Sequence, residues 1–94
     1  MKLNFLNIKT PKEIQLRIAK NIRKRRKELK LTQEEFSKKS GVSFGSIKRF
    51  ENTGEISLFS LIKIAIILGC KDEFLNLFQQ KQYSSIEEII NEQD

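Results

Sequence analysis

The sequence predicts an all-α fold, a small bundle of five helices built around two short helices joined by a tight turn. Three observations favour this fold. Residues that cap helices recur along the chain, apolar residues follow each cap at intervals of three and four, and Gly41 and Gly69 stand where helices should stop. A length of 94 residues fits one domain. We expect an N-terminal arm at 1–9, the helical domain at 10–79 and an acidic tail at 80–94.

The central helix pair spans residues 31–51. Thr32 can cap the first helix, with Glu35 three residues later to close a capping box, and Gly41 ends it. Ser43 then caps the second helix. Apolar positions on the two helices predict a small shared core of Phe36, Val42, Ile47 and Phe50. Such a pair holds its second helix rigidly and leaves the outer face free, which is the geometry of a recognition helix in a DNA major groove.

A long helix precedes this pair. Thr10, Pro11 and Glu13 form a strong start signal, and the helix should run to about Leu29. Spacing predicts an inward stripe of Ile14, Ile18, Ile22, Arg25 or Arg26, and Leu29. Its other faces carry the basic residues Lys20, Arg23, Lys24, Arg25, Lys27 and Lys30. A solvated face is the simple interpretation, but so many like charges favour contact with phosphates.

Two helices follow the central pair, after a predicted loop at 52–55. Ser57 begins a helix that Gly69 ends, and this helix is apolar almost all round, so we expect it to be buried on most sides. A short helix from Asp72 to about Gln79 carries Phe74, Leu75, Leu77 and Phe78. These four side chains either complete the core or form a self-association surface.

The acidic tail at 80–94 contains a last helical signal, with Ile86, Ile89 and Ile90 along one side. It is too short to be stable alone. It therefore docks on its own domain, on a second subunit or on another protein.

Charge is divided unevenly along the chain. Residues 1–30 carry eleven Lys and Arg against two Glu, a net +9, whereas residues 31–94 carry seven against ten Asp and Glu, a net −3. A field polarised in this way favours an anionic partner such as nucleic acid.

Several classes of function are disfavoured by composition. The chain has no histidine and a single cysteine, Cys70, so His-based catalytic triads and structural zinc sites are excluded. No phosphate-binding glycine loop or nucleophile motif occurs. We expect no enzyme activity, no cofactor and no metal. We also expect no membrane segment, and the lone cysteine fits a reducing, cytoplasmic location.

The stretch RIAKNIRKRRKELKLTQEEFSKKSGVSFGSIKRFE resembles the Cro/CI (XRE-type) helix-turn-helix repressors, over about residues 14–78. The matching positions are Ile18, Ile22, Arg26, Leu31, Thr32, Gln33, Phe36, Gly41, Val42, Ile47, Phe50, Glu51, Leu68 and Gly69. The resemblance implies a compact five-helix, lambda-repressor-like bundle. It also implies binding of double-stranded operator DNA, usually as a homodimer.

Site residues follow from the resemblance, position by position. The implied DNA-contacting residues are Gln33, Ser43, Phe44, Gly45, Ser46, Lys48, Arg49 and Asn52. Arg26 and Glu51 match a structural salt bridge between the first helix and the end of the recognition helix. Dimer or partner contacts are expected from Phe74, Leu75, Leu77, Phe78, Ile86, Ile89 and Ile90.

Three departures from the family pattern bear on function. Ser37 stands where Ala is usual, so its hydroxyl needs a partner. Phe44 and Gly45 stand where polar readers are common; Phe44 offers only apolar contact, best to a thymine methyl, and Gly45 offers no side chain. Arg49 then becomes the natural guanine reader. The alternative is a protein-interaction module of the same fold with weak or no specific DNA binding.

The tail carries a second resemblance. Its pattern LFxxxxYxSIEEII, within residues 76–90, is similar to HipB-type antitoxins, which are encoded beside HipA-type kinase toxins. This implies a protein that represses its own operon and binds a HipA-type kinase.

Overall fold

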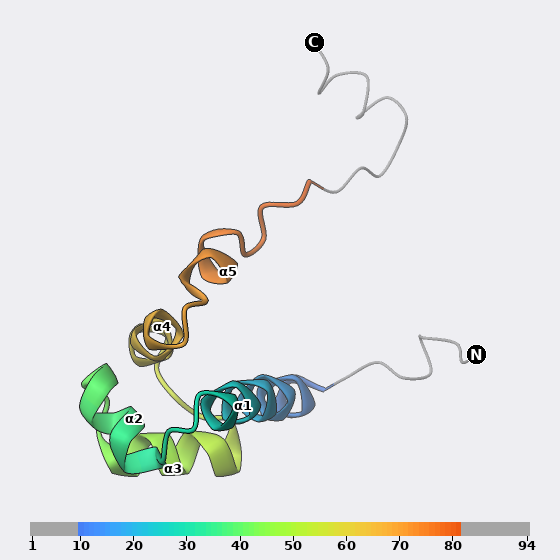
Figure 1. The fold of residues 1–94 in the computed structure, drawn as a ribbon. Helices are drawn as coiled ribbons and strands as arrows, with labels where there is room; N and C mark the ends of the chain where they lie inside the picture. Colours follow the sequence, from blue (N-terminus) through green and yellow to red (C-terminus); the bar gives the residue numbers. More distant parts are fainter. Residues whose placement is uncertain (1–9, 82–94) are drawn as a thin grey trace, which may run out of the picture.

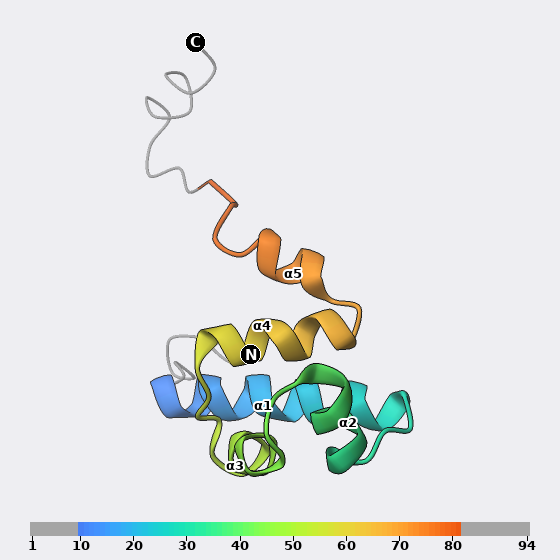
Figure 2. The same cartoon turned by 90° about the vertical axis from the view of Figure 1, so that its left-hand side faces the viewer.

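A computed structural model describes residues 10–81, and every regular element in this range is a helix (Figures 1 and 2). The elements are α1 (Pro11–Glu28), α2 (Gln33–Ser40), α3 (Phe44–Thr53), α4 (Leu58–Ile67) and α5 (Lys71–Leu75). The predicted all-α fold is confirmed. The expected arm at 1–9 and the tail residues Ile86, Ile89 and Ile90 lie outside the described residues.

The helix starts follow the predicted caps. The Thr10 hydroxyl accepts a bond from the Glu13 N–H (3.1 Å), and the Glu13 carboxylate accepts one from the Thr10 N–H (2.8 Å). Thr32 and Glu35 form the same reciprocal pair at α2, with the same two distances. Each box satisfies two backbone donors that a helix start would otherwise leave unbonded. Local sequence therefore fixes where both helices begin.

The turn between α2 and α3 is held by hydroxyl groups. Gly41 ends α2 in the left-handed conformation. The Ser37 hydroxyl, which needed a partner, donates to the Val42 carbonyl at 2.6 Å, and the Ser40 hydroxyl accepts from the Val42 N–H at 3.2 Å. Both backbone groups of Val42 are thereby bonded while its side chain is buried. Ser37 is thus compatible with a rigid turn.

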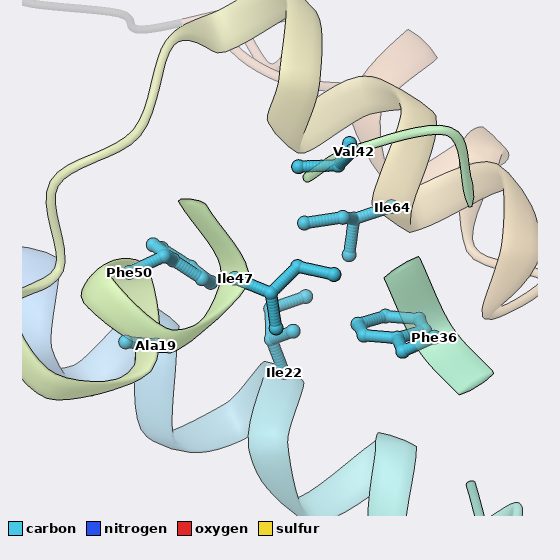
Figure 3. Close-up of a cluster of buried hydrophobic side chains, with 7 residues drawn as sticks. All are labelled: Ala19, Ile22, Phe36, Val42, Ile47, Phe50 and Ile64. Carbon is cyan, nitrogen blue, oxygen red and sulfur yellow. The ribbon is translucent and has the colours of Figure 1, made fainter. Parts of the chain in front are cut away.

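The core lies where α1, α2, α3 and α4 meet (Figure 3). Its buried members are Ala19, Ile22, Phe36, Val42, Ile47, Phe50 and Ile64. The predicted core of the central pair is confirmed, because all four of its members are buried. Truncating a buried Phe to Ala typically costs about 3–5 kcal/mol, so these few side chains carry much of the stability.

The predicted inward stripe of α1 is wrong at three positions. Ile14, Ile18 and Leu29 are exposed, and the residues of α1 that are buried are Ala19, Ile22 and Arg26. The buried side of α1 is rotated relative to the predicted stripe because α1 packs mainly against α3. The small side chain of Ala19 allows the two helices to approach closely. Arg25 lies seven positions, or about two turns, after Ile18, so both residues are on the same side of α1. Arg25 contacts Glu73, so this side faces α5.

The expectation that α4 is buried on most sides is also wrong. Only Ile64 and Ala65 of this helix are buried, whereas Leu58, Phe59 and Ile66 are exposed. Helix α4 packs against α2 and α5, and the side that carries Leu58, Phe59 and Ile66 is left exposed. Its all-round apolar character is therefore not explained by the core of a single chain.

Two helix ends differ from the predicted ones. Helix α3 continues through Asn52 to Thr53, so Asn52 is helical and the loop starts only at Gly54. Helix α5 ends at Leu75 instead of about Gln79. It is only five residues long and has no side-chain cap bond at its start. In Figure 1 it lies beyond α4, apart from α2 and α3.

Gly54, the residue that ends α3, lies close against α1. A Cβ added there would lie 2.7 Å from the Gln15 Cβ and 2.8 Å from the Gln15 carbonyl carbon. Gly69 has a similar positive φ, 74° against 80°, but open space around it. Gly69→Ala should therefore cost about 1–2 kcal/mol from the left-handed backbone alone. Gly54→Ala should cost about 1–3 kcal/mol more, because α1 must shift.

Urea unfolding followed by circular dichroism measures this difference directly. Equal losses of unfolding free energy in the two variants would show that the α1–α3 contact at Gly54 is not as close as described.

Candidate nucleic-acid interface

Helix α3 has one buried side and one open side. Ile47 and Phe50 point into the core, whereas the predicted DNA-contacting residues of this helix are exposed. They are Phe44, Gly45, Ser46, Lys48, Arg49 and Asn52. Ser43 caps the same helix and Gln33 starts α2, so the eight predicted DNA-contacting residues lie on the helix pair and its turn. The structure therefore places them on one open part of the bundle.

The inner side of α3 is anchored by a buried ion pair. Arg26 of α1 donates to both carboxylate oxygens of Glu51, from Nε at 2.8 Å and from Nη2 at 3.0 Å. Its Nη1 donates to the Leu31 carbonyl at 2.7 Å. The Arg26 and Glu51 side chains are only 8% and 3% exposed. A two-pronged, desolvated pair of this kind fixes the orientation of α3 relative to α1.

Gln33 joins the same network from α2. Its Nε2 donates to Oε1 of Glu51 at 2.9 Å, so all three helices meet at this one carboxylate. Arg23 of α1 also lies 3.9 Å from Oε1, from a side chain that is 55% exposed. Glu51 thus connects the buried Arg26–Glu51–Gln33 network to Arg23 on the solvent-facing surface of α1.

A strongly basic face runs along α1 from this point. It forms a shallow hollow of about 680 Å³, and its lining residues are Arg17, Lys20, Asn21, Arg23, Lys24, Lys27 and Glu28. Five of the seven are cations and one is an acid. Arg23 lies 3.9 Å from Oε1 of Glu51, whose side chain is buried on the inner side of α3, so this basic face borders α3. A surface that carries so many cations attracts polyanions.

The first turn of α3 is organised by two serines. The Ser43 hydroxyl accepts from the Ser46 N–H at 3.1 Å and donates to the Ser46 hydroxyl at 2.8 Å. Ser43 is thereby used as the cap, while the Ser46 hydroxyl keeps its own hydrogen for an outside acceptor. The exposed N-terminus of α3 also favours an anion through its free backbone N–H groups.

Phe44 and Lys48 lie one helical turn apart on this face. The Lys48 ammonium sits 5.6 Å from the centre of the Phe44 ring, and Phe44 remains 41% exposed. The face of the ring therefore makes a cation–π contact with Lys48, and the ring still has an apolar edge that is open to a partner. Phe44 is not part of the core.

Gly45 has no structural reason to be a glycine. It sits inside α3 without a positive φ, and a Cβ there would meet nothing within 4 Å. Gly45→Ala should therefore raise the free energy of unfolding by about 1 kcal/mol through helix propensity alone. If the glycine lets the backbone approach DNA closely, the same variant should bind DNA more weakly.

Chemical unfolding and DNA titration of Gly45→Ala test the two effects separately. A variant that is more stable and binds DNA as the parent chain does would show that Gly45 is not needed for close approach.

Arg49 has an intramolecular partner that sequence reasoning missed. Its Nη2 donates to Oε1 of Glu55, and Lys12 of α1 lies 3.3 Å from Oε2 of the same carboxylate. The hydrogen bond from Lys12, with the charges of Lys12 and Arg49, holds the pKa of the Glu55 carboxyl below its usual range. No local spacing rule connects these residues, because Arg49 and Glu55 lie on either side of a turn and Lys12 is far away in sequence.

Exposed apolar side chains also occur on α4 and in the segment around α5. They are Leu58, Phe59, Ile66, Leu75, Leu77 and Phe78. Phe74 is half-buried. Among the predicted partner contacts, those within the described residues are therefore largely open to solvent.

Helices α2 and α3 are joined by a tight turn, α3 is held on its inner side by the Arg26–Glu51 pair, and its outer side is exposed next to basic residues. This arrangement defines a helix-turn-helix DNA-binding domain. A family model described as "Helix-turn-helix" matches residues 22–75, more than half of the chain. The chain belongs to this Cro/CI (XRE-type) helix-turn-helix family. No curated protein and no solved structure matches the chain. Among residues 10–81, no helix is both long enough and apolar enough to cross a membrane.

Proposed function

We propose that this DNA-binding regulator is a sequence-specific repressor that acts by occupying an operator. The observation that carries the proposal is the exposed face of α3, anchored from behind through Glu51 and flanked by the basic face of α1. Placed in the major groove, this face presents Arg49 to a guanine edge and Phe44 to a thymine methyl. Gln33, Ser43 and Asn52 then contact phosphates on either side.

Selection of binding sites from a randomised DNA library tests this proposal. A repressor enriches a defined sequence and binds it more tightly than a scrambled duplex of the same length. Failure to enrich any sequence would contradict the proposal.

A homodimer fits the same function. The exposed apolar residues on α4 and around α5 supply a surface that one chain leaves uncovered, as large apolar patches at interfaces do. Two copies related by a two-fold axis would read two half-sites, so the selected sequence should be an inverted repeat. Sedimentation of the free protein reports the oligomeric state independently, and a monomer at all concentrations would contradict the dimer.

Binding of a HipA-type kinase is the finer part of the proposal. It rests on the similarity of residues 76–90 to HipB-type antitoxins. Deleting residues 80–94 should abolish co-purification with the kinase encoded next to this chain and leave DNA binding unchanged. Co-purification that survives the deletion would show that the tail is not the binding segment.

The second candidate is a protein-interaction module that no longer reads DNA. Phe44 and Gly45 favour it, because neither can donate or accept a side-chain hydrogen bond at a base edge. In that case the exposed Phe44 would be an anchor for a protein partner. Phe44→Ala would then disrupt a protein complex, whereas in a repressor it alters preference for thymine in the selected sequence.

A further inference from the structure

Glu55 is an exposed acidic side chain that contacts Arg49 of α3 and Lys12 of α1. It follows the left-handed Gly54 that ends α3, and its own N–H bonds to the Thr53 hydroxyl at 3.1 Å. That hydroxyl donates in turn to the Arg49 carbonyl at 2.7 Å. The backbone around Glu55 is thus fixed to the last turn of α3, and the carboxylate is held beside the Arg49 side chain.

The Glu55 carboxylate bonds to two cations at once, one from each helix. Arg49 of α3 uses Nη2 on one oxygen, and the Lys12 ammonium lies 3.3 Å from the other. Lys12 is itself held in place, because it also donates to the Thr53 carbonyl at 2.8 Å. All three charged side chains are about half-exposed or more, so their contribution to folding is small, but their field acts directly on whatever approaches α3.

The ion pairs of Glu55 should affect binding to phosphates and binding to bases differently. Attraction to phosphates is Coulombic and independent of sequence, and it weakens when a cation already has a counterion. Hydrogen bonds to base edges depend on the directions of the donors. Arg49 keeps Nε and Nη1 available while Glu55 occupies Nη2. Glu55 should therefore suppress sequence-independent binding more than sequence-specific binding.

We propose that Glu55 is a specificity-determining residue, an internal counterion that keeps Arg49 and Lys12 from acting as general phosphate clamps. The proposal rests on the proposed DNA-binding function and adds a residue to it. In the free protein the carboxylate is shared by the two cations and offsets one of their two positive charges. At the correct sequence, Arg49 gains base contacts that offset the repulsion between Glu55 and nearby phosphates. At a wrong sequence it gains none.

The test compares Glu55→Gln with Glu73→Gln. Both variants remove one negative charge from a carboxylate paired with an exposed arginine. Glu73 lies on α5, away from α3, and pairs with Arg25 of α1. Anisotropy titrations on the selected operator and on a scrambled duplex are repeated over a range of salt. Glu55→Gln should raise affinity for the scrambled duplex about 3- to 10-fold and steepen its salt dependence by about one unit. Affinity for the operator should change less, so discrimination falls.

A double-variant cycle with Arg49→Ala shows whether Glu55 acts through Arg49, since the Glu55→Gln effect should shrink in that background. Equal effects of Glu55→Gln and Glu73→Gln would overturn the inference while leaving DNA binding intact. A Glu55→Gln variant that loses operator affinity alone would overturn it too, because Glu55 would then orient Arg49. Absence of binding by the unmodified chain would overturn the proposed function itself.

Discussion

Replacing Arg26 with alanine is expected to lower the free energy of unfolding by about 3–5 kcal/mol. The variant leaves the Glu51 carboxylate buried without its cation, and the Leu31 carbonyl loses its bond from Nη1. Gln33 alone cannot compensate a buried negative charge. Because small domains are stable by only about 5–15 kcal/mol, a large share of the variant should be unfolded at physiological temperature.

Arg25 provides the matched control one position earlier. It also donates twice to a carboxylate, that of Glu73, at 2.7 and 3.3 Å, but the two side chains are 44% and 63% exposed. Exposed pairs contribute little, so Arg25→Ala should unfold almost as the parent chain does in a urea titration. Similar losses in both variants would show that burial of the Arg26–Glu51 pair is not what makes it important.

Replacing Arg49 with alanine is expected to lower discrimination between the selected operator and single-base variants by about 1–3 kcal/mol, concentrated at one base pair of each half-site. Arg49 is the exposed side chain on α3 whose fork of donors suits guanine. Stability should change little, since the side chain is 67% exposed. Titrations against operators changed at one position at a time measure the loss.

Gln33→Ala is the comparison for that experiment. Gln33 braces Glu51 and is expected to contact phosphate, so its loss should weaken binding to all sequences alike. If Arg49→Ala instead weakens every duplex equally, Arg49 contacts phosphate and base recognition lies with Lys48, Ser46 or Phe44.

The features that sequence predicted well are those decided over a few residues. The capping boxes at Thr10 and Thr32, the stop at Gly41 and the small core around Phe36 and Ile47 all follow from spacing within one or two turns. Caps and glycine stops act on the backbone next to them, so no tertiary information is needed.

The features that sequence missed depend on which neighbours a helix meets. Ile14 and Ile18 fit an inward stripe as well as Ala19 does, and only the close packing of α1 on α3 selects Ala19. Likewise, the apolar face of α4 predicted burial because hydrophobicity does not reveal whether the covering partner is the same chain. Glu55 was missed because its contacts with Arg49 and Lys12 cross a turn and join two helices.

The same contrast applies to the interface. Resemblance to the family pointed to the positions on α3 and to Arg26–Glu51, and the structure contains that ion pair in two-pronged form. The continuity of the α1 basic face with α3, seen at the Arg23–Glu51 contact, required three-dimensional coordinates. Charge counts alone had indicated only that the first thirty residues are strongly basic.

The most direct test of the account is the salt dependence of DNA binding by the unmodified chain. Titrations on the selected operator and a scrambled duplex between about 50 and 200 mM salt give log affinity against log salt. If the basic face of α1 and Lys48 neutralise about four phosphates, both slopes should be near −3.6, with the operator line higher by a constant offset. A flat line, or no binding at the lowest salt, would contradict the claim that this surface meets DNA.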